Sequence, residues 1–377
     1  MVWLIATTHD HPSIKALQSI CPHGLTAHKE GETVLLRDGE GKVRARLFWR
    51  SGYVGLQGLR GYEKSLKRIE GALIKMAFAR RLPALENLGL RRGQSAHEAF
   101  TRIAQRLLEV MEANEAGVLA DLDVEFLHDF RVSLRRTRSL LSQLRAVFAP
   151  AVFERWRAAF KETGTYSGEQ RDLDVWLESL QRCADRALLE RLNADRAAAH
   201  GALCRYLRSA RWRNLKKAWH EALQSPPDSR RFSAAAAEPI EEVAAARLKR
   251  QFKRVIQDGR AITPASPPQS LHTLRIDCKK LRYLLEFFEP LFPATAALIA
   301  PLKQLQEVLG NHQDACVQIE RLQTLQAGMP GRETLQTLSA LTIEAEKARL
   351  LWRGRFAGAF ARFDRAENRR IFAKEAL

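Results

Sequence analysis

Several features typical of common enzyme and membrane classes are absent from the sequence. The five cysteines are scattered and form no Cys-x-x-Cys pair, so nothing indicates a zinc site or a dithiol redox centre. No segment has the roughly 18 consecutive uncharged apolar residues of a membrane-spanning helix, and the N-terminal apolar run is too short for a signal peptide. Neither a Gly-x-x-x-x-Gly-Lys loop nor a nucleophile elbow occurs. We therefore predict a soluble cytoplasmic protein with no catalytic residue, metal or cofactor.

Acidic residues are few relative to basic ones. The chain has 61 Lys and Arg against 43 Asp and Glu, which gives a net charge of +18 and an isoelectric point near 10.1. An excess of this size predicts a polyanionic partner: nucleic acid, an anionic membrane surface or polyphosphate. The hydrophobic content of 46% supports a globular protein, and 377 residues are enough for two or three domains.

One basic motif occurs twice, 144 residues apart. Each copy begins with a histidine, His128 and then His272, and continues with four cationic positions at the same spacing. These positions are Arg131, Arg135, Arg136 and Arg138 in the first copy, and Arg275, Lys279, Lys280 and Arg282 in the second. Self-similarity at this scale predicts two halves of similar architecture.

Each copy of the motif predicts an amphipathic helix. At about 100° per residue, the histidine and the first, second and fourth cations fall within an arc of about 80°. Apolar residues lie on roughly the opposite face: Phe130, Leu134, Leu141, Leu144 and Phe148, then Leu274, Leu281, Leu285 and Phe288. Like charges at i,i+4 repel by a few tenths of a kcal/mol each, so a multiply charged anion would relieve the row of cations.

The region before the repeats differs in composition from the rest. Residues 1–90 combine short apolar runs with Gly-rich breaks, which predicts a small α+β segment with a hairpin at residues 38–41. A helix is expected over residues 62–81, ended by Pro83. Residues 1–90 also contain four irregularly spaced histidines, His9, His11, His23 and His28. We expect these side chains to be exposed or locally hydrogen-bonded and not to bind a metal.

Two helical repeats are predicted after this segment, over residues 91–225 and 238–370. A linker rich in Pro and Ser separates them. Ser95 and Glu98 form a capping-box start for the first helix. Within the first repeat we expect a helix break over residues 164–168 and a kink near Ser209.

The motif and its companions resemble the CHAD family, the conserved histidine α-helical domain. The companions are Arg-Asp-Leu-Asp-Val, starting at Arg171, and Leu-Gln-Glu-Val-Leu-Gly-Asn, which leads to Asp314. The resemblance covers about residues 90–370. It implies a mainly α fold of two pseudo-symmetric four-helix bundles, with basic helices lining a central groove or pore. It also implies binding of inorganic polyphosphate, often at polyphosphate granules, through the ten motif positions. Lys279 and Lys280 replace arginines of the family pattern, which keeps the charge but loses bidentate geometry.

The sequence therefore predicts a non-enzymatic module that binds inorganic polyphosphate in a basic cleft or pore. Further cations at helical spacing are expected to widen the contact: Lys249, Arg250, Lys253, Arg213, Arg349 and Arg353. One alternative is a nucleic-acid-binding protein that uses the same surface, although few aromatics interleave with the cations; the nearest are Tyr283, Trp212 and Trp352.

The other alternative is a metal-dependent polyphosphate-processing enzyme. Its carboxylates would be Asp172, Asp174 and Asp314, but pairing of these groups with the basic helices explains them more simply. For His128 and His272, contact with ligand and a structural hydrogen bond both stay open. If the histidines contact ligand, binding should tighten as pH falls below about 7.

Overall fold

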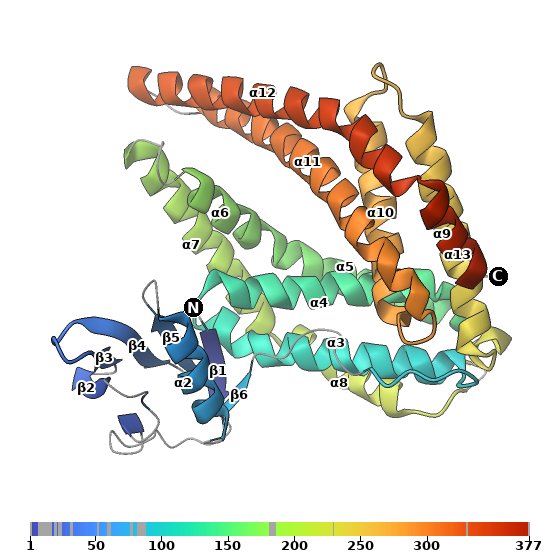
Figure 1. The fold of residues 1–377 in the computed structure, drawn as a ribbon, viewed down its shortest axis with the longest axis horizontal. Coiled ribbons are helices and arrows are strands. Elements are labelled where there is room, and N and C mark those ends of the chain that lie inside the picture. The colour runs from blue at the N-terminus through green and yellow to red at the C-terminus, as the bar shows by residue number, and fades with distance from the viewer. Residues whose placement is uncertain are drawn as a thin grey trace. The chain divides into compact units, whose positions relative to one another are not determined.

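The computed structural model is mainly α-helical, with a β-sheet confined to the N-terminal part of the chain, as predicted (Figure 1). It describes residues 2–6, 17–18, 21, 25–30, 33–50, 53–58, 62–75, 78–80, 88–180, 186–228, 230–328 and 331–375. The chain forms two compact units, residues 1–84 with 109–130 and residues 85–108 with 131–377. The boundary between them therefore falls inside α3 (Ala96–Leu119) and α4 (Val124–Gln143). No helix in the described ranges is long and apolar enough to cross a membrane.

The first unit contains a six-stranded antiparallel sheet in the order β2-β3-β4-β5-β1-β6. Its strands are β1 (Val2–Ala6), β2 (Thr26–Glu30), β3 (Thr33–Arg37), β4 (Val43–Arg50), β5 (Tyr53–Gly58) and β6 (Phe78–Arg80). Side chains from β3, β4 and β5 share a buried apolar cluster with Ile69 of α2 (Glu63–Lys75). Burial of this one sheet face accounts for the alternation of the strands.

The prediction of a helix over residues 62–81 was wrong at its C-terminal end. The helix α2 ends at Lys75, and residues 78–80 form β6, which pairs with Leu4, Ile5 and Ala6 of β1. This pairing satisfies backbone groups along an edge of β1 that would otherwise be open. The partner strand lies more than 70 residues away in the sequence, so local periodicity could not reveal it.

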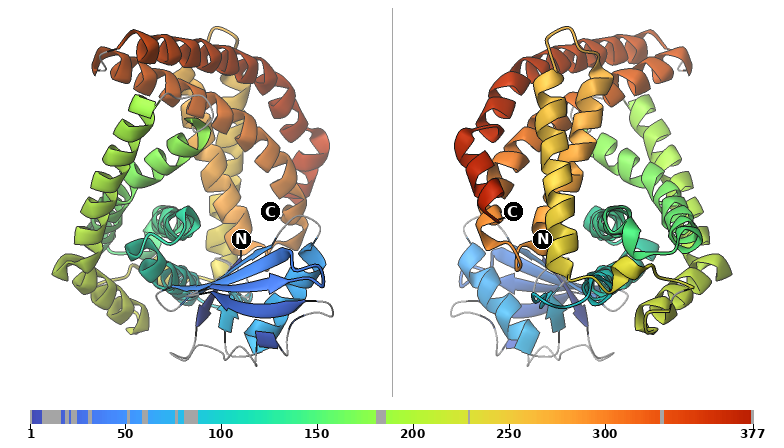
Figure 2. Two further views of the ribbon diagram at one scale, coloured as in Figure 1. Left: turned by 90° about the vertical axis from the view of Figure 1, so that its left-hand side faces the viewer. Right: turned by 90° about the vertical axis from the view of Figure 1, so that its right-hand side faces the viewer.

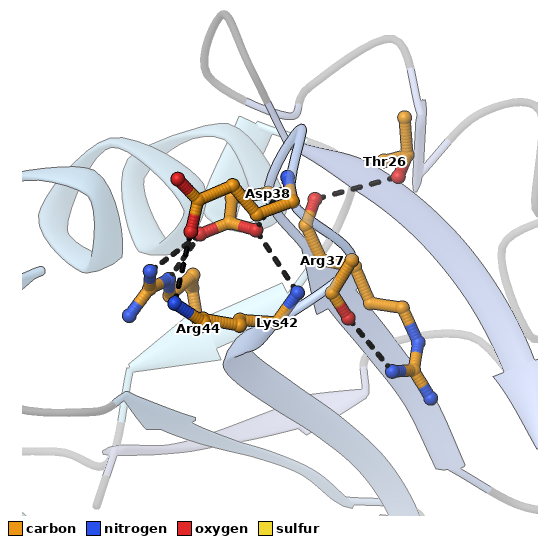
Figure 3. A network of polar contacts seen from close by, with 7 residues as sticks. Thr26, Arg37, Asp38, Lys42 and Arg44 are labelled. Carbon is orange, nitrogen blue, oxygen red and sulfur yellow. Dashed lines mark hydrogen bonds and ion pairs between the residues drawn. The ribbon is translucent and has the colours of Figure 1, made fainter.

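The predicted hairpin joins β3 to β4 and is held by Asp38. One carboxylate oxygen of Asp38 accepts hydrogen bonds from the backbone N–H groups of Lys42 at 2.9 Å and Glu40 at 3.0 Å. The other accepts from Nε of Arg44 at 2.6 Å (Figure 3). Gly41 has a φ of 77°, the left-handed conformation that favours glycine. Of the histidines in this segment, His28 is exposed and bonds to Thr26 at 3.0 Å, whereas His9, His11 and His23 lie outside the described residues.

The second unit is helical and follows one element order twice. After α3 and α4 come η1 (Arg145–Val147), α5 (Pro150–Tyr166), α6 (Gly168–Leu180), α7 (Arg186–Arg208) and α8 (Ala210–Gln224). The second half contains η2 (Ala234–Ala236), α9 (Ile240–Ala261), α10 (Pro268–Phe288), η3 (Pro293–Leu298), α11 (Ile299–Gly328), α12 (Arg332–Phe363) and α13 (Ala366–Glu375). The helices α9 and α10 begin 144 residues after α3 and α4, the offset of the basic motif. This order is compatible with the predicted pseudo-symmetry.

Serines interrupt two helices of the first half that are continuous in the second. The helix α5 extends to Tyr166, so the predicted break over residues 164–168 narrows to Ser167. The expected kink near Ser209 is confirmed as a break, because the Ser209 side chain caps α8 by accepting from the backbone N–H of Trp212. The corresponding helices α11 and α12 pack along one another as a long hairpin (Figure 1).

The two halves of the second unit contact each other through the ends of their long helices. Leu173 and Trp176 of α6 share a buried cluster with Leu322 of α11 and Leu338 of α12. Arg321 of α11 pairs with Asp172 at 3.1 Å, and its guanidinium lies 5.1 Å from the centre of the Trp176 ring. The basic helix α10 packs between α9 and α11 (Figure 2).

Ser95 caps α3 through the predicted capping box. Its Oγ accepts from the backbone N–H of Glu98 at 3.2 Å, and Glu98 Oε2 accepts from the backbone N–H of Ser95 at 3.1 Å. Replacing Ser95 by Ala should lower the free energy of unfolding by about 1 kcal/mol, as measured by urea denaturation. Ser142→Ala, at an exposed position inside α4, is the control and should change it by less than about 0.5 kcal/mol.

Candidate anion-binding site

The basic motifs form two rows of cations on α4 and α10, which are half-buried except for Arg138, which is exposed. We name Arg131, Arg135 and Arg138 the α4 row, and Arg275, Lys279 and Arg282 the α10 row. The opposite faces of both helices are buried, as the periodicity predicted: Phe130, Leu134, Leu141, Leu274, Leu281 and Leu285 are at most 1% exposed. Each helix is therefore fixed by its apolar face, and its cations are held in place.

The α4 row and the α10 row lie within electrostatic reach of each other. Burial, followed by the neighbouring charges of Arg275 and Arg135, lowers the pKa of Lys279 to about 8. Arg275 belongs to the same row, but Arg135 belongs to the other half of the repeat. Burial likewise lowers the pKa of Arg131 to about 10, with a contribution from Arg135. The two halves thus bring like charges together where Arg135 approaches Lys279. Without a bound anion, this repulsion costs free energy.

Several guanidinium groups in the rows keep a buried donor without an acceptor. The Nε atoms of Arg131, Arg135, Arg275 and Arg282 are buried and have no hydrogen-bond partner among the described residues. Arg131 does donate through Nη1 to the carbonyl oxygen of Gly164 at 3.3 Å and to Ser167 Oγ at 3.1 Å. A buried donor left unsatisfied costs about 1–3 kcal/mol. Oxygens of a bound anion would supply the missing acceptors.

Gly164 and Gly168, which bound the predicted helix break, leave space for the guanidinium groups of the α4 row. A Cβ atom on Gly164 would lie 3.0 Å from Nη1 of Arg138, and one on Gly168 would lie 3.5 Å from Nη1 of Arg131. The junction of α5 and α6 therefore approaches the guanidinium groups closely. The signal in the sequence was the Gly-x-x-x-Gly spacing inside a helical pattern.

Three of the predicted cations are paired with carboxylates of α10, and a fourth, Arg275, lies 3.8 Å from Asp314 of α11. Arg136 and Arg282 both contact Glu286, at 2.8 Å and 3.4 Å, and Arg136 comes from the other half of the repeat. Lys280 pairs with Asp277 at 2.9 Å, a carboxylate that is 1% exposed. The residue at the position of Asp277 in the first motif is Ser133, so Arg136 finds its counter-charge across the repeat instead of on its own helix.

The carboxylates proposed as a metal set are divided among cationic partners. Asp172 pairs with Arg321 at 3.1 Å, and Asp314 lies 3.8 Å from Arg275. Asp174 is buried and bonds to Arg196 of α7 at 2.6 Å. Each of these carboxylates therefore has a basic partner, but only the partner of Asp314 lies on a basic motif helix as predicted, because Arg321 belongs to α11 and Arg196 to α7.

The two motif histidines lie in different surroundings. Nδ1 of His272 is 2.7 Å from Oε1 of Gln313; since an amide oxygen only accepts, Nδ1 carries the proton and α11 orients the ring. His128 belongs to the first unit. There, one ligand atom each of Glu125, His128 and Asp129 lie within 4.8 Å of one another, a group that could hold a metal ion and that the sequence analysis did not anticipate.

The predicted secondary cations fall into two groups. Lys249, Arg250, Lys253 and Arg213 are exposed on α9 and α8. Arg353 instead donates hydrogen bonds to the carbonyl oxygens of Thr263 and Ser266, both at 2.7 Å, and so braces the loop between α9 and α10. Arg349 is half-buried. It lies near His312, whose pKa is lowered by the burial of the imidazole and then by the charges of Arg353 and Arg349. Contact with the ligand stays a prediction for these cations. It fits the exposed residues of α8 and α9 better than it fits Arg353, which is already bonded to backbone carbonyl groups.

Comparisons with known proteins agree on the family. A family model described as the CHAD domain matches residues 102–323, more than half of the chain. The crystal structure of the CHAD domain from the plant Ricinus communis superposes with a TM-score of 0.54 and 28% identity, and the match covers 75% of this chain and 92% of that one. PptA from Streptomyces chartreusis matches with a TM-score of 0.51 and 17% identity over 68% of this chain and 98% of its own, which shows a shared fold. No curated protein matches. With the family model, the solved domain and the duplicated basic motif in agreement, the chain belongs to the CHAD family.

Proposed function

We propose that this protein binds inorganic polyphosphate between the α4 row and the α10 row. The observation that carries the proposal is the approach of Arg135 to Lys279, which brings cations of both halves together around buried guanidinium donors. A linear polyphosphate presents roughly one negative charge per phosphate and only oxygen acceptors, so guanidinium and ammonium groups suffice to hold it. Membership of the CHAD family supports the same ligand.

The surroundings of the aromatic side chains favour polyphosphate over nucleic acid. Tyr283 is 6% exposed, with the guanidinium groups of Arg136 and Arg282 at 5.8 Å and 5.3 Å from the centre of its ring. Trp212 is fully buried. Neither ring can act as a platform on which bases stack. The rows therefore suit a ligand that consists of phosphate alone.

We further propose that the protein holds polyphosphate without cleaving it. Two carboxylates of the candidate metal set, Asp172 and Asp314, have arginine partners, which supports a role in balancing charge. Incubation with long-chain polyphosphate and Mg²⁺ or Mn²⁺ should leave the chain length unchanged on a gel. Time-dependent shortening that Asp314→Asn removes would establish an enzyme instead. Association with polyphosphate granules in the cytoplasm is part of the proposal, and colocalisation of a fluorescent fusion with stained granules tests it.

Competition between polyanions tests the ligand class. Fluorescently labelled polyphosphate should bind in fluorescence anisotropy, and unlabelled polyphosphate should displace it at concentrations at least about tenfold below those of RNA or single-stranded DNA of equal charge. All polyanions lose affinity with salt, so the comparison must be made at one ionic strength. Displacement by RNA at the lower concentration would assign the site to nucleic acid.

Polyphosphate binding should weaken as pH rises through the pKa of Lys279. Below about pH 8 this side chain is charged in the free protein; above it the proton is lost and one attraction to the anion disappears. Affinity should fall between pH 7 and pH 9.5, and binding near pH 8 should take up protons, measurable by calorimetry in buffers of different ionisation enthalpy. Lys279→Arg is the control and should flatten this part of the profile, because arginine stays charged. An equal pH slope in both proteins would exclude Lys279 as its origin.

A further inference from the structure

The first half of the repeat contains a cavity apart from the basic rows. It has a volume of about 360 Å³ and lies between α3, α5, α8 and the linker after α8. Its buried lining is apolar: Phe100, Phe148, Trp156, Trp219 and Leu223. Exposed Arg155, Glu221 and Arg231 border it at the surface. A cavity with an apolar interior and a few charged groups at its opening is typical of a site for a small organic molecule.

The sequence explains why the first half has this space where the second half has a helix. The residue 140 positions after Phe232 is Phe372, which lies in α13. In the second half α13 packs on η3, and the Phe372 ring stacks on Phe252 with centroids 4.1 Å apart. The first half has an irregular linker at this place instead, because Pro226 and Pro227 do not continue a helix. The ring of Phe232 still packs against Phe148, but no helix fills the volume beside it.

The aromatic lining is preformed. The rings of Trp156 and Trp219 meet at 4.6 Å and 65°, and those of Phe100 and Phe148 meet at 4.7 Å and 81°. Phe100 also lies edge-on to Trp219 at 6.0 Å. Such edge-to-face contacts hold each ring in one orientation. A planar apolar ligand would therefore enter a cavity whose shape is already fixed, without an ordering cost.

The opening of the cavity favours an anion. The guanidinium carbon of Arg155 lies 5.1 Å from the centre of the Trp156 ring, which keeps this cation at the cavity. The backbone of Arg231 is held by a hydrogen bond from the N–H of Ala149 to its carbonyl oxygen at 2.9 Å. Among the described residues no carboxylate lies within ion-pair distance of either guanidinium group. Arg155, Arg231 and one carboxylate, Glu221, thus lie at the rim. Outside the lining, Asp228 pairs with Arg230, and hydrogen bonds from Arg230 and the charges of Arg230 and Arg231 lower its pKa.

We propose that this cavity binds a small organic anion that carries an aromatic ring, such as an aryl carboxylate. The ring occupies the apolar interior, and the carboxylate lies at the opening near Arg155 and Arg231. Guanidinium groups recognise a carboxylate through paired N–H donors. Inorganic polyphosphate has no ring and a neutral aromatic compound has no charge, so neither uses both parts of the cavity.

Calorimetric titration with 2-naphthoate tests the proposal. One molecule should bind per chain with a dissociation constant below about 1 mM, and the neutral naphthalene-2-carboxamide should bind roughly tenfold more weakly. Ala222→Trp should abolish binding, because Ala222 lines the cavity and a bulky side chain there fills it. Arg231→Gln should weaken binding roughly fivefold, which is about 1 kcal/mol. Lys161→Gln, which removes one charge at an exposed position of α5 outside the lining, is the control and should change nothing.

Three outcomes would overturn the proposal. They are a titration with 2-naphthoate that does not saturate, equal affinities of the protein for 2-naphthoate and the carboxamide, or unchanged affinity of the Ala222→Trp variant for 2-naphthoate. Far-UV circular dichroism and polyphosphate binding serve as separate controls for Ala222→Trp, because the cavity lies outside the α4 row and the α10 row. The surface variant Arg231→Gln keeps the test decisive if the tryptophan disturbs folding. Failure of this site would leave the polyphosphate proposal untouched.

Discussion

Reversing the charges of Arg135 and Lys279 together is expected to abolish polyphosphate binding. Arg135→Glu with Lys279→Glu places two carboxylates where the α4 row and the α10 row approach each other. Each change removes an attraction to phosphate and adds a repulsion in a half-buried site, where charges are poorly screened. Affinity should fall by more than about 100-fold at constant ionic strength. Fluorescence anisotropy with labelled polyphosphate measures the loss.

A matched charge reversal away from the rows separates this site from general electrostatics. Lys161→Glu with Lys303→Glu changes the net charge by the same amount at exposed positions of α5 and α11. It should weaken binding by less than about tenfold. Helicity and the thermal midpoint of the Arg135 and Lys279 variant should not fall, since the two introduced carboxylates lie among the remaining cations of the rows. If both pairs weakened binding equally, the ligand would be held by overall charge and the proposed site would be wrong.

Replacing Gly259 by Ala is expected to destabilise the second half strongly. A Cβ atom at this position of α9 would lie 2.0 Å from Cε2 of Phe360 on α12, closer than real Cβ contacts come. The helices must separate or the buried ring must move, and overpacking of this kind costs about 1–3 kcal/mol even after the better helix propensity of Ala. Urea denaturation followed by far-UV circular dichroism should show the lower midpoint.

Gly310→Ala provides the opposite result on a neighbouring helix. Gly310 lies in α11, where an added Cβ would meet nothing within 4 Å, so Ala should raise stability by up to about 1 kcal/mol through helix propensity. Combining Gly259→Ala with Phe360→Leu should recover part of the loss, because the smaller side chain makes space. Equal midpoints for Gly259→Ala and Gly310→Ala would contradict the close approach.

The sequence predicted most where a structural feature depends on residues of one helix. The faces of α4 and α10 follow from a period of 3.6 residues, and the cap at Ser95 follows from short-range hydrogen bonds. Features that depend on distant partners were not predicted: the pairing of β6 with β1, and the ion pair of Arg136 with Glu286. Tertiary contacts decide these, and no local pattern encodes them.

The same limit applied to the basic site. The repeat identified the ten cationic and histidine positions, but it could not rank them. Burial and neighbouring charge distinguish Arg131 and Lys279, with their depressed pKa values, from Lys280, which is neutralised by Asp277. The role of Arg353 in bracing a loop was likewise hidden, because its acceptors are backbone carbonyl oxygens about 90 residues away.

The difference between Ser133 and Asp277 makes the two halves chemically unequal. In a hypothetical chain with two copies of the second half, each copy of Lys280 would have a copy of Asp277 beside it on the same helix. No ion pair between the halves would be needed at that position. A chain with two copies of the first half would have Ser142 where Glu286 stands, leaving both Arg136-type guanidinium groups without a counter-ion. The first half therefore depends on the second for the counter-charge of Arg136, whereas the second half supplies its own counter-charge for Lys280.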